Sequence, residues 1–205
     1  MKPNPFCVLP ETVTIDGVAY PIDYDYRVGV AIEREALEHD KPDAEGLLHL
    51  FYRGNIPHNV GEAVKQMLWF YQAPTLEPEG GQEKEKSQQG GRWYDFEQDR
   101  DVLLASFFSA YGIDLSTEKI HWWTFRRLML NLPTDSRFME RVHYRTANLS
   151  KLSKDQKKHY RKMKALYAIK DNRVEHHKTV EESEAALLEK VRKRFQEAQA
   201  QTSEP

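Results

Sequence analysis

The sequence predicts a mainly α-helical protein, a helical bundle with a small N-terminal β-hairpin. Along most of the chain, apolar and aromatic residues recur every three or four positions, which places them on one side of a helix. A proline or a glycine follows most of these stretches and ends the helix there. Only around Asp16-Gly17 do β-branched residues alternate with other residues, as in two short strands joined by a tight turn.

The composition is that of one folded globular domain or two small ones. The 205 residues are 40% hydrophobic and 30% charged, with a mean hydropathy of -0.75. No stretch approaches the roughly 20 apolar residues that a membrane span needs, and the N-terminus has no apolar run of secretory length. Cys7 is the only cysteine, which excludes an internal disulfide and a cysteine-rich metal site. We therefore expect a cytoplasmic protein without a membrane partner.

Residues 1–73 are predicted to form the hairpin and the first helices. The two strands are expected at 12–15 and 18–22, and so short a hairpin needs support from neighbouring helices. The helical patterns that follow are expected at about 24–39, 43–52 and 59–73.

Two segments of the chain are polar. Residues 74–92 combine two prolines, two Gly-Gly pairs and a charged middle, which is the composition of a linker. Residues 171–205 are charged and sparse in large apolar residues. A thin apolar stripe within them predicts an exposed amphipathic helix over 179–199, followed by a polar tail. Between these segments, residues 93–170 are expected to form a separate part of the fold.

That part is predicted to contain four aromatic-rich helices. In the first, Asp95 is expected to cap the N-terminus and Gly112 to close the C-terminus. Carboxylates such as Asp99 and Asp101 suit its first turns, where the helix dipole favours negative charge. Its expected apolar stripe comprises Phe96, Leu103, Leu104, Phe107, Phe108 and Tyr111.

The other three helices follow without long gaps. The second is apolar on two sides, including Leu130, and this indicates burial between neighbours before Pro133 ends it. The third is expected at about 135–147. The fourth begins at Ser153, whose hydroxyl fits a capping box with Gln156, and reaches about residue 169.

The sequence contains no recognisable pattern for catalysis or for a cofactor. The histidines lack the i, i+4 pair with an intervening acid that a zinc hydrolase needs, and His121 is best interpreted as a packed or capping residue. No Gly-x-Ser-x-Gly turn and no phosphate-binding glycine loop is present. We expect a protein that is not an enzyme and that binds no metal.

A basic segment offers a possible binding surface. Residues 121–170 hold 13 Lys+Arg against 3 Asp+Glu, whereas residues 1–50 hold 4 against 10. Within the basic segment, Tyr160, Met163 and Tyr167 recur every three or four residues and indicate the core side of a helix, which leaves the cations on the other side. That side has three interpretations: a solvated face, a surface for an acidic protein, or a nucleic-acid surface that also uses tyrosine stacking.

The aromatic residues are also open to two interpretations. Most simply they form the core, but some of them are candidates for a groove that binds an amphipathic helix. The candidate partner-binding residues are Trp93, Tyr94, Trp122, Trp123, Arg145, Lys157, Lys158, Arg161 and Lys162.

Four stretches give the chain a family resemblance: YDFEQD, SFFSAYGIDL, HWWTFRRLM and YRTANLSKLSKDQKKHYRKMKALYA. In these stretches the chain resembles the bacteriophage gp-fifteen family, which is encoded beside the tape-measure gene of long, non-contractile-tailed phages and their prophages. The resemblance is close over residues 93–169 and looser before them. It implies a phage morphogenesis protein, most directly a tail assembly chaperone.

The resemblance also implies the partners. A tail assembly chaperone holds the tape-measure protein while tail tube protein polymerises around it, and it does so in the cytoplasm of the bacterial host. We expect weak homo-oligomers, because many weak, repeated contacts suit a protein that coats a long polymer. The alternative function is a nucleic-acid-binding phage protein that uses the basic helix 153–169.

Overall fold

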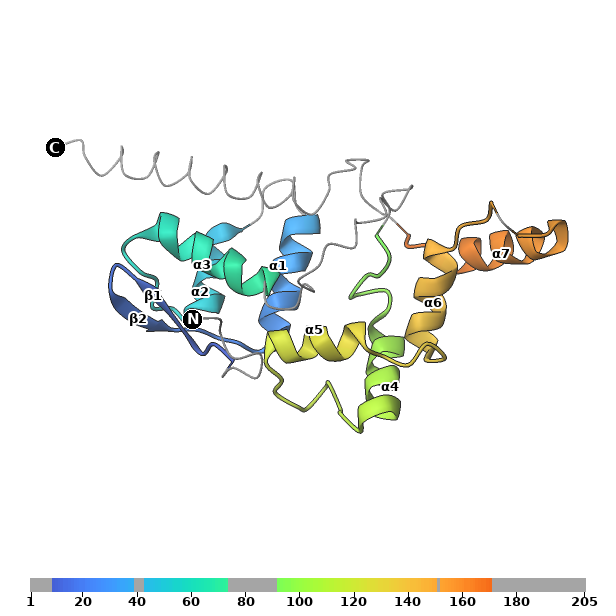
Figure 1. Cartoon of the computed structure of the whole chain (residues 1–205). Coiled ribbons are helices and arrows are strands. Elements are labelled where there is room, and N and C mark those ends of the chain that lie inside the picture. The colour runs from blue at the N-terminus through green and yellow to red at the C-terminus, as the bar shows by residue number, and fades with distance from the viewer. Residues whose placement is uncertain (1–8, 39–42, 74–91, 151, 171–205) are drawn as a thin grey trace, which may run out of the picture. The chain divides into compact units, whose positions relative to one another are not determined.

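The computed structural model describes residues 9–38, 43–73, 92–150 and 152–170 (Figure 1). In these residues it contains seven helices and one two-stranded antiparallel sheet, so the predicted mainly α-helical fold with an N-terminal hairpin is confirmed. The predicted helix at 179–199 and nearly all of the predicted linker lie outside the described residues.

The chain divides into two compact units. Of the described residues, the N-terminal unit comprises 9–38, 43–73 and 120–125, and the second unit comprises 92–119, 126–150 and 152–170. Residues 120–125 thus belong with the N-terminal part of the chain, whereas the sequence pattern grouped them with the helices on either side of them.

The hairpin of the N-terminal unit consists of β1 (Thr12–Ile15) and β2 (Val18–Pro21). Asp16 and Gly17 both have positive φ, at 50° and 80°, and this is the backbone of the tight turn that the Asp-Gly pair favours. The side chains of Val13 and Ile15 are buried, while Thr12 and Thr14, which alternate with them, are exposed. The strand thus has one face towards the core.

Three helices follow the hairpin along the chain in this unit: α1 (Tyr26–Glu38), α2 (Ala44–Phe51) and α3 (Val60–Gln72). Asp43 and Asn59 cap α2 and α3, because each side chain accepts a hydrogen bond from a backbone amide three residues on. The inner sides of the helices bury large residues, among them Ile32, Leu48, Phe51, Phe70 and Met67.

The two tryptophans of α5 (Trp122–Leu130) complete the same core. Trp122 Nε1 donates a hydrogen bond to the carbonyl oxygen of Tyr71 at 2.8 Å, and Trp123 Nε1 donates to that of Phe70 at 2.7 Å. These carbonyls lie in the last turn of α3, where the helix supplies no i+4 amide and only the cap amide of Ala73 reaches that of Phe70, at 3.3 Å. The pair of tryptophans therefore satisfies the C-terminal end of α3 while filling the core beside it.

The second unit contains α4 (Arg100–Tyr111), the remainder of α5, α6 (Arg137–Thr146) and α7 (Lys154–Leu166). α6 lies between α4 and α7 (Figure 1). The core is formed mainly by α4, α6 and the segments that join the helices. Its most deeply buried apolar side chains are Leu103, Phe107, Leu115, Met129, Leu132 and Phe138.

Two details of the predicted helices in this unit are wrong. The helix α4 begins at Arg100, and Asp95 instead caps a turn by accepting hydrogen bonds from the amides of residues 97 and 98. Phe108 is 64% exposed and Leu130 is 49% exposed. The predicted apolar stripe on α4 is wider than the side of the helix that packs against the core. Phe108 follows Phe107 directly and is therefore rotated by about 100° around the helix axis, away from the core.

Candidate interaction surfaces and a buried charged cluster

Asp99 carries an almost fully buried carboxylate, with 1% of its side chain exposed. It occupies the N-cap position of α4, but it makes no capping hydrogen bond there. Its Oδ1 accepts from Arg141 Nη1 at 3.0 Å and from Arg145 Nη2 at 2.9 Å. Its Oδ2 accepts from Arg145 Nη1 and, at 3.0 Å, from the amide of Asp95. Two guanidinium groups and one backbone amide therefore satisfy this carboxylate, and we call these residues the Asp99 cluster.

The cluster keeps Asp99 ionised. Burial alone would raise the pKa of the Asp99 carboxyl, because it removes the charge from water. Hydrogen bonds from Arg145, from the Asp95 amide and from Arg141 act in the opposite direction and prevail, so the pKa of Asp99 lies below its ordinary value. The charge of the guanidinium group of Arg145 adds to this effect.

Arg145 joins three segments of the second unit. Besides Asp99, its guanidinium donates to the carbonyl oxygens of Trp93 and Tyr167, and only 7% of its side chain is exposed. Arg145 was a candidate partner-binding residue from the sequence. The structure places its charged group inside the unit, where it fixes the segment before α4 and the end of α7 to α6.

Trp93 and Tyr94 are half-buried beside this cluster. Their rings meet edge to face with centroids 4.3 Å apart, and the Tyr94 ring contacts Phe96 at 4.9 Å. Of the four aromatic candidates, these two keep part of their surface open to solvent. The other two, Trp122 and Trp123, are 1% and 5% exposed and belong to the core of the N-terminal unit.

His121 is packed beside the tryptophans of the N-terminal unit. Its Nδ1 accepts from the amide of Trp123 at 3.1 Å, and its Nε2 lies 3.0 Å from the carbonyl oxygen of Pro10. An acceptor role at Nδ1 and a donor role at Nε2 define the neutral tautomer with the proton on Nε2. The ring also stacks on Tyr24, with centroids 5.3 Å apart. This is the packed and capping role that the sequence favoured.

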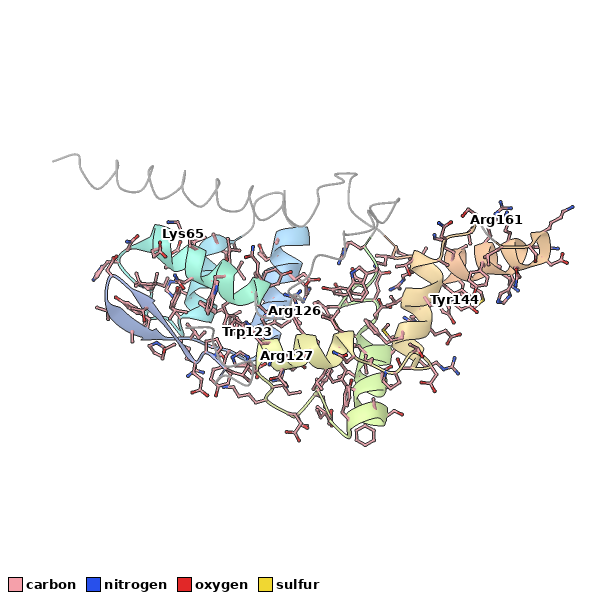
Figure 2. The ribbon with its side chains drawn as sticks, in the orientation of Figure 1. Lys65, Trp123, Arg126, Arg127, Tyr144 and Arg161 are labelled. Carbon is pink, nitrogen blue, oxygen red and sulfur yellow. The ribbon has the colours of Figure 1, made fainter. Side chains whose placement is uncertain are left out.

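Histidines and tyrosines form the seam between α6 and α7. His143 Nε2 lies 3.1 Å from the hydroxyl of Tyr160, and the hydroxyl of Tyr144 lies 3.4 Å from His159 Nε2. The Tyr144 ring also packs on the rings of Tyr160 and Tyr167, at 5.2 and 5.8 Å between centroids. Figure 2 shows Tyr144 in this position, between the two helices. The aromatic side of α7 thus faces α6.

The cations of α7 lie on its other side. Lys154, Lys158, Arg161 and Lys162 are exposed, whereas Lys157 is half-buried at the edge of the seam. α7 itself has no fully buried residue. We call the four exposed cations the basic face of α7.

The helices α4 and α5 each carry one exposed large apolar residue in the last turn. The hydroxyl of Tyr111 donates to the carbonyl oxygens of Leu128 and Asn131, at 2.9 Å each, so the C-terminal ends of the two helices are neighbours. Phe108, one turn before Tyr111, and Leu130 are both exposed large apolar residues. We call these two residues the end patch.

The sequence did not reveal the Asp99 cluster. Arg141 and Arg145 have the i, i+4 spacing that places both on one side of α6, and this spacing is the one feature of the sequence that indicates the cluster. Their partner lies 42 residues earlier than Arg141, in a segment whose carboxylates were interpreted as helix-dipole charges. Only the tertiary fold singles out Asp99 from Asp101, which is exposed.

The described residues hold no group of three or more histidine, cysteine, aspartate or glutamate side chains that could bind a metal ion. No described helix combines the length and the apolar character that a membrane crossing requires.

Comparison with known proteins identifies one family. The family model described as Bacteriophage Gp15 protein matches residues 8–169, which cover most of both units. The match includes the Asp99 cluster, the seam and the basic face, and it confirms the family that the sequence resemblance indicated. The comparisons with curated proteins and with solved structures gave no match.

Proposed function

The chain belongs to the Bacteriophage Gp15 protein family, and from this premise we propose that it acts as a phage tail assembly chaperone. In this role, copies of the protein bind apolar helical surface on the tape-measure protein, keep it from aggregating and give way to tail tube protein. It works without catalysis and without a cofactor, in the cytoplasm of the bacterial host.

The observation that carries this proposal is the family match over residues 8–169. The end patch supports it, because a chaperone must present apolar side chains that a partner can cover. Phe108 and Leu130 are 64% and 49% exposed, and Leu166 is the other described large apolar residue of the second unit that is exposed to this degree.

The size of the end patch fits brief binding. Covering one large apolar side chain completely contributes about 1.5–3 kcal/mol, and these two side chains are already partly covered. Such a contact is weak in a single copy. Several copies along one tape-measure chain, in weak homo-oligomers, bind it firmly together and can still leave one at a time when the tube advances.

Co-expression tests the proposal. We expect more soluble tape-measure protein when it is expressed with this chain than when it is expressed alone. Equal solubility in both cultures would contradict the chaperone function.

Variants test whether the end patch causes the gain in solubility of the tape-measure protein. Replacing both Phe108 and Leu130 by serine is expected to remove most of the gain in solubility, because the end patch is lost. Leu50→Ser is the matched control, since Leu50 is also an exposed leucine in a helix, 43% exposed, but lies in the N-terminal unit. Circular dichroism of each purified variant shows whether it is folded.

A further inference from the structure

We infer that the basic face of α7 is a docking surface for an acidic helical segment of the partner protein. This inference rests on the proposed function for the identity of the partner, the tape-measure protein. The chemistry of the partner, a helix with carboxylates one turn apart, follows from the spacing of the cations on α7.

The cations of the basic face form a continuous row. Lys154, Lys158 and Lys162 follow one another at intervals of four residues, and Arg161 lies beside them, so the row extends over about 12 Å of helix. In Figure 2, Arg161 projects outward from α7. None of the four cations has an ion-pair partner in the part of the chain that the structure describes.

This arrangement is unfavourable for α7 by itself. Like charges four residues apart destabilise a helix by roughly 0.2–0.5 kcal/mol for each pair, and α7 contains the pairs Lys154–Lys158, Lys158–Lys162 and Lys157–Arg161. Lys154 and Lys157 also lie in the first turn, where the helix dipole disfavours positive charge, and Asp155 is the one acidic residue of that turn. An acidic partner would remove this repulsion on binding, whereas solvent alone only screens it.

The seam argues for a protein partner over a single-stranded nucleic acid. A single-stranded nucleic-acid site needs aromatic rings on which bases stack, next to the cations. The tyrosines that could serve, Tyr144, Tyr160 and Tyr167, pack against one another and against histidines in the seam. The basic face therefore offers charge without stacking.

The acidic N-terminal part of a second copy is a poorer fit, because six of its carboxylates already have partners in the described residues. Asp23 pairs with Arg53 and Asp25 with Arg27. Four further carboxylates accept hydrogen bonds inside the unit, namely Asp16, Glu33, Glu35 and Asp43.

The end of α7 adds an apolar contact. Leu166 is 67% exposed and follows the row of cations at the C-terminal end of the helix. A partner helix that pairs its carboxylates with the row would place an apolar residue against Leu166. Such a helix is amphipathic as well as acidic.

Binding of synthetic peptides to the full chain tests the inference. The probe is a labelled helical peptide with glutamate at every fourth position and one leucine at its end, and its control has glutamine in place of glutamate. By fluorescence anisotropy we expect the glutamate peptide to bind and the glutamine peptide to bind much more weakly. Binding of the glutamate peptide is expected to weaken with added salt.

The discriminating variant replaces Lys158, Arg161 and Lys162 by glutamine. We expect it to bind the glutamate peptide roughly tenfold more weakly, since three surface ion pairs of ordinary strength are lost. Unfolding of α7 cannot explain such a loss, because glutamine is a good helix former and the change removes like-charge repulsion.

The matched control replaces Lys65, Arg100 and Arg137 by glutamine. These three cations are also exposed, with 67%, 72% and 79% of their side chains accessible, and the net charge changes equally. We expect its affinity for the glutamate peptide to stay within about twofold of the original. Equal weakening by both variants would show a nonspecific charge effect and overturn the inference.

Two other outcomes would also overturn it. In the first, the chain binds a labelled single-stranded or duplex DNA oligonucleotide more tightly than the glutamate peptide, and the variant of Lys158, Arg161 and Lys162 no longer binds the DNA. The other is self-association of the chain that the same variant abolishes, which would make a second copy the occupant of the basic face.

Co-expression separates this inference from the proposed function. If the chain solubilises the tape-measure protein and the variant of the basic face does so equally well, the docking surface is wrong and the chaperone function stands. If the chain binds the glutamate peptide but never solubilises the tape-measure protein, the chaperone function is wrong and the acidic-helix site stands.

Discussion

The carboxylate of Asp99 is the partner of a guanidinium group that is almost as deeply buried as itself. In Asp99→Ala, Arg145 would remain inside the second unit without its carboxylate. Leaving one member of a buried ion pair uncompensated costs about 3–5 kcal/mol. We expect the free energy of unfolding of this unit to fall by that amount, measured by urea unfolding.

Asp101 supplies the control for Asp99→Ala. It is an aspartate two residues later, 86% of its side chain is exposed, and its ion pair with Arg100 lies at the surface. Exposed ion pairs contribute only about 0–1 kcal/mol. Similar urea midpoints for Asp99→Ala and Asp101→Ala would contradict the buried role of the Asp99 cluster.

The lowered pKa of Asp99 predicts a loss of stability in acid. Between the lowered pKa of the folded state and the ordinary value of 3.8, the unfolded state binds the proton and the folded state does not. The contribution of Asp99 is therefore complete above the ordinary pKa and disappears as the pH falls through the folded value.

Asp99→Asn tests this pH dependence, because asparagine has a similar shape and does not ionise. We expect the urea midpoint of the original protein to fall more steeply between about pH 5 and pH 2 than that of the variant. The other carboxyls with lowered pKa values, Glu62 and Asp114, titrate equally in both proteins and cancel in the comparison. Parallel curves would show that Asp99 does not titrate as proposed.

Among the helices, α1 depends on a glycine for its packing. A Cβ atom built on Gly29 would overlap the indole ring of Trp122, so the helix can approach this ring only where no side chain intervenes. Gly29→Ala is expected to lower the free energy of unfolding by about 1–3 kcal/mol, as overpacked cores do. Near-ultraviolet circular dichroism would report the displaced tryptophan.

Gly61 in α3 is the matched control. A Cβ atom there would meet only the side-chain oxygen of Asn59, at 3.9 Å, which is an ordinary contact. Since alanine is a better helix former, Gly61→Ala is expected to be neutral or to stabilise by up to about 1 kcal/mol. The packing interpretation fails if Gly29→Ala behaves in the same way.

At the scale of helices and strands, the sequence predicted best what depends on neighbours in the chain. The Asp-Gly turn of the hairpin and the capping box of Ser153 and Gln156 are both present, because each involves residues at most three positions apart. The start of α4 was predicted too early, since Asp95 can cap a turn as well as a helix. Local chemistry alone does not distinguish the two.

The candidate site was harder to predict, because burial decides it. Four aromatic candidates have similar chemistry, yet Trp122 and Trp123 lie in a core and Trp93 and Tyr94 keep part of their surface exposed. Arg145 and Arg161 are both arginines in basic helices, yet only Arg161 is exposed. Helical periodicity on α7 did separate its tyrosine side from its cation side, since one helix contains both.

At the scale of the whole molecule, the two units are not successive segments of the chain. The second unit begins before residue 120, but residues 120–125 complete the core of the N-terminal unit. Trp122 and Trp123, which lie in this segment, donate the indole hydrogen bonds to the carbonyl oxygens of Tyr71 and Phe70. A boundary drawn at the polar segment 74–92 would therefore remove part of the first core.

Truncation tests this dependence. A fragment of residues 1–119 keeps all of β1, β2 and α1–α3 but lacks both indoles, and loss of a buried tryptophan typically costs about 3–5 kcal/mol. A fragment of residues 1–132 keeps them. In hydrogen exchange, we expect the amides of α3 to exchange much faster in the shorter fragment. Equal protection of α3 in the two fragments would mean that the N-terminal unit folds without Trp122 and Trp123, and that the chain can be divided at the polar segment.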